Sequence, residues 1–581
     1  MSGGRVVRVA GPVVVAEGLA ETRLYNVVRV GRRRLVGEVI KLSGSQAVIQ
    51  VYEDTGGLQV GSDVEDTGAP FDVELGPGLV GGIFDGVQRA LPALARDGDR
   101  PFARPFLRRG IEVPSLDRAR RYLVQPAVEV GAVVAEGDVV ATAPETPAIE
   151  HRIMVPGGRG GTITAVMSGS LTVEDVVVEI DGQPLTMVAR WPVRRRRPHR
   201  RRLDPTAPLV TGQRIVDTLF PVARGGSATI PGGFGTGKTV HEQTLAKWSD
   251  ADVIVYVGCG ERGNELAEVL EEFPRLVDPR TGSTLMDRTI LIANTSNMPV
   301  AAREASIYTA ITIAEYYRDQ GYDVALMADS TSRWGEALRE VSSRLEEMPG
   351  EEGYPAYLPS RLAEFYERAG AVEALGAPAR TGSVTVVGAV SPPGGDFSEP
   401  VTQYSLRLAG TFWALDPDLA RRRHYPAIHW TRSYSLYELG EWFDQAVAPD
   451  FDEQRRWALE LLGVEEELQS IVRLLGVDVL APVERVTFHT GRLLREDFLQ
   501  QSAFDPVDAF CPLVKQYWML AVIRRTHRLT TAAAAEGADP DTILSLPALA
   551  GIGRMRDWPA DEAEDRAGDL IAAIEREVAS L

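Results

Sequence analysis

The chain has 581 residues, of which 62 are Lys or Arg and 81 are Asp or Glu, so its formal net charge is −19. Such a length corresponds to about three to five domains, and 44 % hydrophobic with 25 % charged residues is typical of a globular rather than a disordered protein. The acidic balance argues against a dedicated nucleic-acid-binding protein, and no apolar run approaches the roughly 20 residues of a transmembrane helix.

The first 75 residues are predicted to form a small β-barrel. Stretches rich in Val, Ile and Tyr follow one another there, and turns that contain glycine separate them. The expected strands are residues 6–15, 24–30, 35–42 and 47–52. Residues 76–112 have a mixed pattern with Gly- and Pro-rich breaks, and we assign them to the beginning of the central domain.

A second β-rich block at residues 113–190 is predicted to be an inserted domain. Its expected strands, separated by Gly and Pro turns, are residues 127–134, 138–142, 161–166 and 171–180. A basic run at residues 194–202 follows this block. We expect a solvated linker there, because the chain is rich in arginine; the alternatives are a polyanion-binding stretch and a nuclear-localisation signal.

Residues 191–438 alternate between strand and helix patterns, which is typical of a parallel α/β sheet. The expected strands are residues 227–230, 253–257, 289–294, 324–328 and 384–390. The expected helices are residues 239–248, 263–273, 300–318 and 335–347. In residues 439–581 apolar residues recur at helical spacing without convincing strands, and this part is predicted to be a C-terminal helical domain.

The segment GGFGTGKT at residues 232–239 has the pattern G-x-x-x-x-G-K-[ST] of a P-loop, and a predicted strand and helix flank it as that motif requires. Its glycines let backbone N–H groups approach phosphate oxygens. Lys238 supplies a compact charge for the β- and γ-phosphates, and Thr239 supplies a hydroxyl for Mg²⁺. We predict nucleotide binding by Gly232, Gly233, Phe234, Gly235, Thr236, Gly237, Lys238, Thr239 and Val240.

Lysine usage supports this interpretation. Lys238 is one of only four lysines among the 62 basic residues, and all the others are arginines apart from Lys41, Lys247 and Lys515. A lysine where the chain otherwise uses arginine indicates a chemical requirement for a point charge.

Two acidic residues follow neighbouring predicted strands. Glu261 comes shortly after residues 253–257, and Asp329 directly follows residues 324–328. Ligands of open α/β sheets bind outside the carboxyl ends of the strands, so we expect both residues at the edge where the P-loop lies. Glu261 either polarises the water that attacks the γ-phosphate or is an ordinary turn or helix N-terminal acid, a role that Glu265 also suits. For Asp329 we favour a Mg²⁺-organising role over that of a turn former.

These residues together predict a Mg²⁺-dependent NTPase that cleaves a β–γ phosphate bond. At this point the chain also resembles the catalytic A subunits of V-type and archaeal or bacterial V/A-type rotary ATPases, over essentially its whole length. The resembling segments are residues 9–13, 49–58, 144–147, Glu150, His151, 426–429, Ser433, Ser435 and 500–505.

The resemblance implies a multidomain fold. Its expected parts are an N-terminal β-barrel at residues 1–75, a β-rich insertion at 113–190, a RecA-like P-loop α/β domain at 76–112 and 191–438, and a C-terminal α-helical domain at 439–581.

The resemblance also implies ATP or ADP with Mg²⁺ as ligands, and a role for individual residues. Glu261 is expected to polarise the lytic water, and Arg262 to steady that carboxylate or to contact phosphate. Tyr425 is expected against the adenine, with Ala503 and Phe504 on the other side of the base. Without the resemblance, Tyr425 and Phe504 would be assigned to the core.

The partners that the resemblance implies are other proteins of a complex rather than nucleic acid. Three A subunits alternate with three non-catalytic B subunits, and B supplies an arginine to the site at one A/B boundary. The other expected partners are a central shaft, a peripheral stalk and, indirectly, a membrane sector that moves protons or sodium ions. The two cysteines, Cys259 and Cys511, are too few for a disulfide framework, and we expect a cytoplasmic location, peripheral on the membrane through those partners.

Three alternatives remain at this stage. The catalytic subunit of an F-type synthase would lack the block at residues 113–190. A hexameric RNA translocase needs an RNA-binding N-terminal domain, which the net charge of −19 disfavours. A non-catalytic nucleotide-binding subunit is disfavoured by the presence of Lys238, Thr239 and Glu261.

Overall fold

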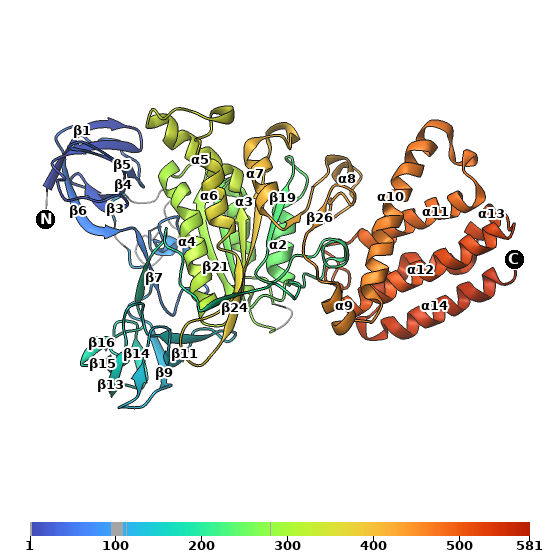
Figure 1. Ribbon diagram of the computed structural model, residues 1–581, viewed down its shortest axis with the longest axis horizontal. Helices are drawn as coiled ribbons and strands as arrows, with labels where there is room; N and C mark the ends of the chain where they lie inside the picture. The colour runs from blue at the N-terminus through green and yellow to red at the C-terminus, as the bar shows by residue number, and fades with distance from the viewer. Residues whose placement is uncertain (1–2, 95–108, 112, 279–280) are drawn as a thin grey trace. The chain divides into compact units, whose positions relative to one another are not determined.

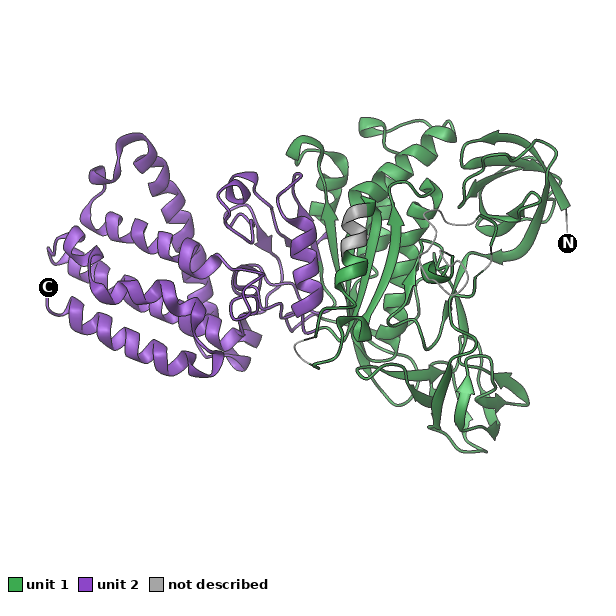
Figure 2. Cartoon of the chain, turned by 180° about the vertical axis from the view of Figure 1, so that it is seen from behind, with its two compact units in different colours: residues 1–204, 225–227, 251–408 green, residues 205–224, 228–250, 409–581 purple. Residues whose placement is uncertain are grey.

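The computed structural model describes residues 3–94, 109–111, 113–278 and 281–581 (Figure 1). The chain divides into two compact units (Figure 2). The first comprises residues 1–204, 225–227 and 251–408, and the second comprises residues 205–224, 228–250 and 409–581. Within the described ranges, no helix is both long enough and apolar enough to cross a membrane.

The N-terminal part of the first unit is a closed barrel with strand order β1-β2-β5-β4-β3-β6 (Figure 1). Its strands are β1 (Gly3–Ala10), β2 (Val13–Glu17), β3 (Asn26–Val30), β4 (Leu35–Ser43), β5 (Gln46–Val51) and β6 (Asp63–Pro70). Alternating apolar side chains, such as Val14, Val28 and Ile49, fill the interior. The predicted barrel is confirmed, but a single strand at residues 6–15 is wrong, because Gly11 (φ +60°) and Pro12 turn the chain into the β1–β2 hairpin.

The inserted domain consists of two four-stranded sheets, with orders β10-β13-β15-β16 and β12-β11-β9-β14. Its strands are β9 (Arg121–Pro126), β10 (Val133–Val134), β11 (Val139–Pro144), β12 (Glu150–Met154), β13 (Gly161–Val166), β14 (Gly169–Thr172), β15 (Val178–Ile180) and β16 (Gln183–Leu185). Two predicted strands are wrong: most of residues 127–134 form a turn around Gly131 (φ +91°), and residues 171–180 are split by the turn at Asp175. Outside the two sheets, β17 (Ala189–Pro192) at the end of the insertion pairs with β7 (Asp72–Leu75), which follows the barrel.

The central sheet of the first unit has parallel strands in the order β24-β22-β20-β21-β8. They are β8 (Ile83–Phe84), β20 (Val253–Glu261), β21 (Thr289–Thr295), β22 (Asp323–Asp329) and β24 (Thr381–Val390). On one edge, β23 (Gly370–Glu373) is antiparallel to β24, and β18 (Arg201–Leu203) is antiparallel to β23. The predicted α/β pattern is confirmed, although β20 continues four residues beyond its predicted end. Gly258, Cys259 and Glu261 pair with β21, and the register shifts at Gly260 (φ +76°) between them.

Helix α4 (Val300–Asp319) is the central helix of this unit, buried from Ala301 to Asp319 and packed on β20, β22 and β24. The other helical segments are α1 (Leu91–Leu94), α3 (Gly263–Glu272), η2 (Leu285–Arg288), α5 (Thr331–Arg344), η3 (Glu351–Gly353), α6 (Leu358–Tyr366), η4 (Pro393–Gly395) and α7 (Pro400–Leu408). Helix α5 begins four residues earlier than predicted, because Ser330 takes extended backbone angles directly after β22 and the helix follows at once.

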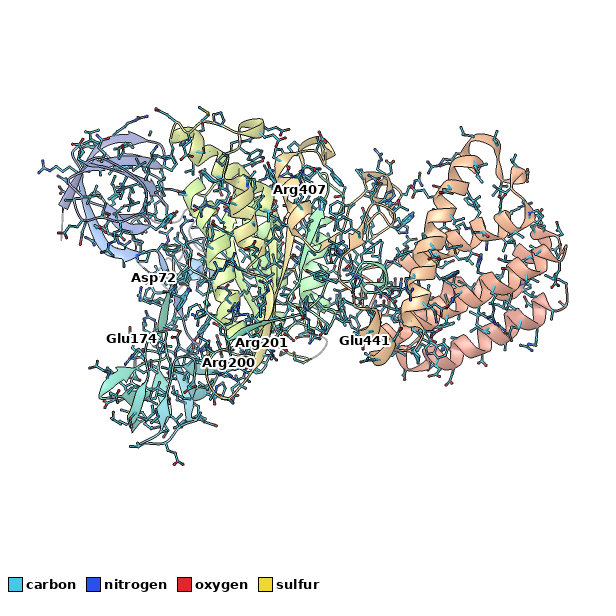
Figure 3. All side chains as sticks on the ribbon, in the orientation of Figure 1. Asp72, Glu174, Arg200, Arg201, Arg407 and Glu441 are labelled. Atoms are coloured by element: carbon cyan, nitrogen blue, oxygen red, sulfur yellow. The ribbon has the colours of Figure 1, made fainter. Side chains whose placement is uncertain are left out.

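The basic run at residues 194–202 is a solvated linker only in part: residues 195, 196 and 198–202 are exposed as predicted, whereas Arg194 and Arg197 are not. Arg194 is largely buried, and its Nη2 lies 2.8 Å from Oε2 of Glu38 and 3.0 Å from Oε2 of Glu304. Arg197 pairs with Asp319 at 2.6 Å. Arg200, which Figure 3 labels, is exposed and pairs with Glu373 at 3.1 Å. The run has this structure because buried acids on α4 and on the barrel require cations.

The second unit contains a small sheet and the helices that follow it. In this sheet β19 (Ser227–Pro231) is parallel to β25 (Thr411–Phe412), which is antiparallel to β26 (Tyr434–Ser435). The helical segments are η1 (Ile215–Leu219), α2 (Lys238–Trp248), α8 (Pro417–Arg421), α9 (Gly440–Ala446), α10 (Phe451–Leu475), η5 (Val477–Val479), α11 (Pro482–Leu493), η6 (Leu494–Leu499), α12 (Leu513–Ala535), α13 (Pro540–Leu544), η7 (Pro547–Asp557), η8 (Ala560–Glu562) and α14 (Ala563–Val578). Helix α11 packs on α10 and α12, and α14 packs on α12, which confirms the predicted helical C-terminal part (Figure 1).

Candidate functional site

The glycine loop connects β19 to α2 in the second unit. Gly235 (φ +78°) and Gly237 (φ +92°) have left-handed backbone angles that residues with a side chain rarely adopt. A Cβ atom on Gly232 would lie only 2.6 Å from Oγ1 of Thr236 and 2.7 Å from Cβ of Leu415. The loop therefore needs glycine at these three positions in order to fold tightly before the helix begins.

Lys238 and Thr236 hold the inside of this loop together. Nζ of Lys238 donates to the carbonyl oxygens of Gly232 at 2.8 Å and Gly233 at 3.3 Å. The hydroxyl of Thr236 donates to the Gly233 carbonyl at 2.8 Å. Lys238 is also the first residue of α2, so the loop leads directly into a helix N-terminus, whose dipole favours negative charge. Both features attract an anion of phosphate size.

A cavity of about 600 Å³ extends from the loop along the first two turns of α2. Gly235, Thr236, Gly237 and Val240 form the part of its wall that belongs to the predicted phosphate-binding segment. The other lining residues are Gln213, His241, Thr244, Leu415, Arg423, Tyr425, Pro426, Ala427, Gln500, Gln501, Ser502, Ala503, Phe504, Ala509 and Arg556. The cavity has the volume of a small-molecule site.

The predicted base-binding residues all line this cavity. The Tyr425 ring approaches the loop, with its Cε1 atom 3.6 Å from where a Cβ on Gly237 would lie. Ala503 and Phe504 come from the segment after η6. Tyr425 and Phe504 are 42 % and 89 % exposed, so neither is a core residue. Two exposed rings beside a cavity are suited to stacking on a planar ligand.

Gln501 fixes the walls of the cavity relative to one another. Its backbone N–H donates to the carbonyl of Tyr425 at 2.8 Å. Its side-chain amide donates to the carbonyls of Gly212 at 2.8 Å and Asp508 at 2.7 Å, and its Oε1 accepts from the N–H of Arg214 at 2.8 Å. One buried side chain thus joins the segments that carry the aromatic residues to the segment that precedes β19.

Glu261, Arg262 and Asp329 belong to the first unit. Glu261 is the last residue of β20 and Asp329 the last residue of β22; the two strands are parallel, with Gly258 in register with Asp329. Both acids therefore lie at the carboxyl edge of one sheet, and Glu261 lies about 7 Å further along than the residue that faces Asp329, because Gly258 and Glu261 pair with residues two apart on β21. Arg262 follows directly, exposed, at the N-cap of α3.

Asp329 is a buried carboxylate, and the hydroxyl of Tyr256 donates to its Oδ2 at 3.3 Å. Cys259 lies two residues before Glu261 on β20. Burial raises the pKa of its thiol to about 12, so this cysteine stays protonated and is not a nucleophile. The main chain of Glu261 is tied to the segment after β21 by the Ser296 N–H, which donates to its carbonyl at 2.9 Å.

Thr239 of the second unit carries a hydroxyl oxygen and Asp329 of the first unit carries carboxylate oxygens, and each is a donor type that Mg²⁺ prefers. Within the described part of the chain, no group of three or more His, Cys, Asp or Glu side chains is arranged to hold a metal. Mg²⁺ in nucleotide sites is bound by one or two protein side chains together with phosphates and water. The residues present therefore fit a metal that arrives with a nucleotide rather than a protein-only metal cage.

The structure thus gathers the predicted site residues in two places. The loop, Val240, Tyr425, Ala503 and Phe504 surround one cavity of the second unit, and Glu261, Arg262 and Asp329 lie at one sheet edge of the first. Sequence reasoning missed Gln213, His241 and Arg556 in the cavity wall. His241 was detectable, because it lies one helical turn after Gly237, whereas Gln213 and Arg556 are remote in sequence.

Comparison with known protein families accounts for most of the chain. Residues 6–68 match the beta-barrel domain of the ATP synthase alpha/beta family, and residues 113–194 match the ATP synthase alpha/beta subunit barrel-sandwich domain. Residues 212–435 match the nucleotide-binding domain of the ATP synthase alpha/beta family. Residues 440–538 match the C-terminal domain of V and A type ATP synthase.

Individual proteins are similar over the full length. The chain is 57 % identical to the second A subunit of the A-type ATP synthase of Methanospirillum hungatei, over 98 % of this chain and 97 % of that one. It is 56 % identical to the A subunit of the A-type ATP synthase of Methanopyrus kandleri, over 100 % and 98 %. The V-type ATP synthase alpha chain of Acetivibrio thermocellus is 52 % identical, over 100 % and 99 %.

A solved structure shares the fold at low sequence similarity. The assembled ATPase EscN from the type III secretion system of enteropathogenic E. coli superposes with a TM-score of 0.63 at 21 % identity, covering 90 % of this chain and 99 % of that one.

Proposed function

Because the chain belongs to the family of catalytic A subunits of A-type and V-type ATP synthases, we propose that residues 232–240 bind the phosphates of ATP or ADP. Tyr425, Ala503 and Phe504 then hold the adenine. The reaction of this family is the synthesis or hydrolysis of ATP, coupled to ion transport. Membership in this family also excludes the three alternative functions: the F-type catalytic subunit, the hexameric RNA translocase and the non-catalytic nucleotide-binding subunit.

In hydrolysis, a water attacks the γ-phosphorus and the bond to the β-phosphate oxygen breaks, with ADP as the leaving group. Glu261 accepts the hydrogen bond of that water and takes up its proton, a contribution of about 10²–10⁴ in rate. Lys238 carries positive charge to the β- and γ-phosphates, and Arg262 steadies the Glu261 carboxylate or contacts phosphate. When bound, Mg²⁺ neutralises charge on the phosphate oxygens, and Thr239 and Asp329 are the residues that hold it.

The proposed assembly has three of these chains alternating with three non-catalytic B subunits. An arginine from B reaches the developing charge on the γ-phosphate, which is worth roughly 10³–10⁵ in rate. The helices of the C-terminal part transmit the opening and closing of the site to a central shaft, and a peripheral stalk resists the rotation. Through these partners the chain acts at the cytoplasmic face of a membrane sector that conducts protons or sodium ions.

The observation that supports this proposal best is the continuity of the glycine loop with the aromatic-lined cavity. Residues 235–237 and Val240 line the same cavity as Tyr425, Ala503 and Phe504, so one ligand with a phosphate tail and a planar base fits both ends. A phosphate ion would occupy only the loop end of the cavity, and a free base only the aromatic end.

The test is the ATPase activity of the purified full-length chain with and without its B subunit. We expect slow hydrolysis by the chain alone and a large increase when B is added, since B completes the site. Glu261→Gln abolishes the increase but leaves ATP affinity intact, whereas Glu271→Gln, an exposed glutamate on α3, serves as the matched control. Full activity from the isolated chain, or unchanged turnover in Glu261→Gln, contradicts the proposal.

A further inference from the structure

Two buried polar side chains line the nucleotide cavity, and each has one polar atom without a hydrogen-bond partner in the described part of the chain. Gln213 is 3 % exposed and His241 is 5 % exposed, and both line the cavity. Among the described residues, Oε1 of Gln213 and Nε2 of His241 have no hydrogen-bond partner. Buried polar atoms are almost always hydrogen-bonded, so an unpaired one beside a cavity indicates a partner that enters with the ligand.

His241 is placed one helical turn from the phosphate-binding end of α2. Its N–H donates to the carbonyl of Gly237 at 2.9 Å, so its Cα lies about 6 Å along the helix axis from the N-cap. The imidazole meets Trp413 edge to face, with ring centroids 5.6 Å apart and an angle of 83°. Because the indole N–H of Trp413 is held by the Phe220 carbonyl at 2.9 Å, the imidazole has a fixed surface to pack on.

His241 lies between Val240 and Thr244, two other residues of α2 that line the cavity. The imidazole ring can donate or accept one hydrogen bond at Nε2. In a nucleotide whose phosphates are bound at the loop, the part that follows the phosphates is the sugar, and its hydroxyl groups suit such a partner.

Gln213 is placed on the base side of the cavity. The residues on either side of it, Gly212 and Arg214, are both bonded to Gln501, whose own N–H binds the carbonyl of Tyr425. The N–H of Gln213 itself donates to the Thr211 hydroxyl at 3.2 Å. With its main chain held in this way, the amide of Gln213 lies on the wall that carries the aromatic ring of Tyr425.

On the basis of the proposed function, we propose that Gln213 and His241 are specificity-determining residues for the nucleoside part of ATP. Oε1 of Gln213 accepts a hydrogen bond from the exocyclic amino group of adenine, and Nε2 of His241 bonds a ribose hydroxyl. Stacking between aromatic rings does not distinguish one purine from another, whereas an acceptor facing the amino group does. Inosine presents a carbonyl oxygen at that position and leaves Gln213 without its partner.

The experiment measures the binding of four probes to the full-length chain: ATP, ITP, 2′,3′-dideoxy-ATP and tripolyphosphate. In Gln213→Leu we expect ATP affinity to fall about tenfold, the preference for ATP over ITP to disappear, and tripolyphosphate affinity to stay the same. In His241→Phe, which keeps a ring against Trp413, we expect ATP and ITP to weaken alike and the preference for ATP over dideoxy-ATP to disappear.

His489→Phe is the matched control, because His489 is also a histidine on a helix, α11, but does not line the cavity. Gln213→Glu, which keeps the shape and the acceptor atoms, should retain the preference for ATP over ITP and replaces Gln213→Leu if that variant unfolds.

An unchanged ATP affinity, or an equal loss for ATP and tripolyphosphate, overturns this inference while leaving the proposed function standing. If the unaltered chain binds neither ATP nor tripolyphosphate, the proposed function fails as well.

Discussion

At the scale of single residues, the chemistry of the loop depends on a lysine in a chain that otherwise uses arginine. Nζ of Lys238 reaches two carbonyl oxygens on the inside of a tight glycine turn. A guanidinium is planar and wider than an ammonium group, so it does not occupy that space in the same way. The requirement is for a compact charge rather than for a charge of any shape.

We therefore expect Lys238→Arg to lower ATP affinity and turnover at least tenfold although the net charge is kept. Lys247→Arg is the control, because Lys247 lies on the same helix, outside the cavity, with its ammonium over the ring of Trp248. Nucleotide titration of both variants checks this; equal affinities for ATP would show that only charge matters at position 238.

His241 also makes the stability of the nucleotide-free chain sensitive to acid. Its pKa is about 4 in the folded protein against 6.5 in the unfolded chain. Because the folded chain favours the neutral ring, His241 contributes about 3 kcal/mol to the free energy of unfolding above pH 6.5. This contribution is lost as the pH falls from 6.5 towards 4. Urea unfolding of the second unit at pH 7 and pH 4.5 should show a smaller loss in His241→Phe than in the unaltered chain. The same loss in both would mean that this imidazole is not buried.

At the scale of elements, the barrel is joined to α4 by buried ion pairs. Arg194 bridges Glu38 of β4 and Glu304 of α4, and the Tyr52 hydroxyl donates to the same Glu38 at 2.9 Å. Both carboxylates are at most 5 % exposed. A buried pair adds little net stability, but removing one partner leaves the others charged and unpaired.

Arg194→Met should consequently lower the free energy of unfolding by about 3–5 kcal/mol. Arg201→Met should change it by less than about 1 kcal/mol, because the Arg201 side chain is 71 % exposed and lies 3.6 Å from Glu373. Thermal unfolding of both variants measures the difference. Combining Arg194→Met with Glu38→Gln and Glu304→Gln should recover part of the loss; no recovery would show that the arginine acts through packing alone.

At the scale of the whole molecule, the helical C-terminal part is tied into the core that carries the glycine loop. The buried guanidinium of Arg214 pairs with Asp508 at 2.6 Å, and the amide of Gln516 donates to Asp217 at 3.0 Å. Burial raises the pKa of Asp217 to about 6, so this carboxyl depends on its hydrogen bonds to stay ionised at neutral pH. The helices are therefore part of the folding unit that binds nucleotide.

A chain that ends after Leu439 should lose this support. We expect hydrogen exchange in β19 and α2 to become fast, because Arg214 and Asp217 lose buried partners at a cost of several kcal/mol. The exchange rates of the barrel strands should not change. Full protection of α2 in the truncated chain would show that the helices fold and act separately.

Features of this protein with a local signal could be predicted from the order of residues alone. The glycine loop needs consecutive residues, and the alternation of strands and helices in the central region follows from the hydrophobic period, so both were predicted. The barrel and the helical C-terminal part were identified in the same way, although the ends of strands were misplaced wherever a glycine such as Gly11 or Gly131 turned the chain.

Features that depend on remote partners became visible only in the folded chain. Arg194 belongs to an apparent linker until Glu38 and Glu304, 156 and 110 residues away, are brought beside it. Gln213 has no recognisable pattern, and Gln501, 287 residues from Arg214, fixes the wall on which it lies. The cause is the same in each case: burial makes a polar group dependent on its neighbours, and folding alone determines which neighbours it has.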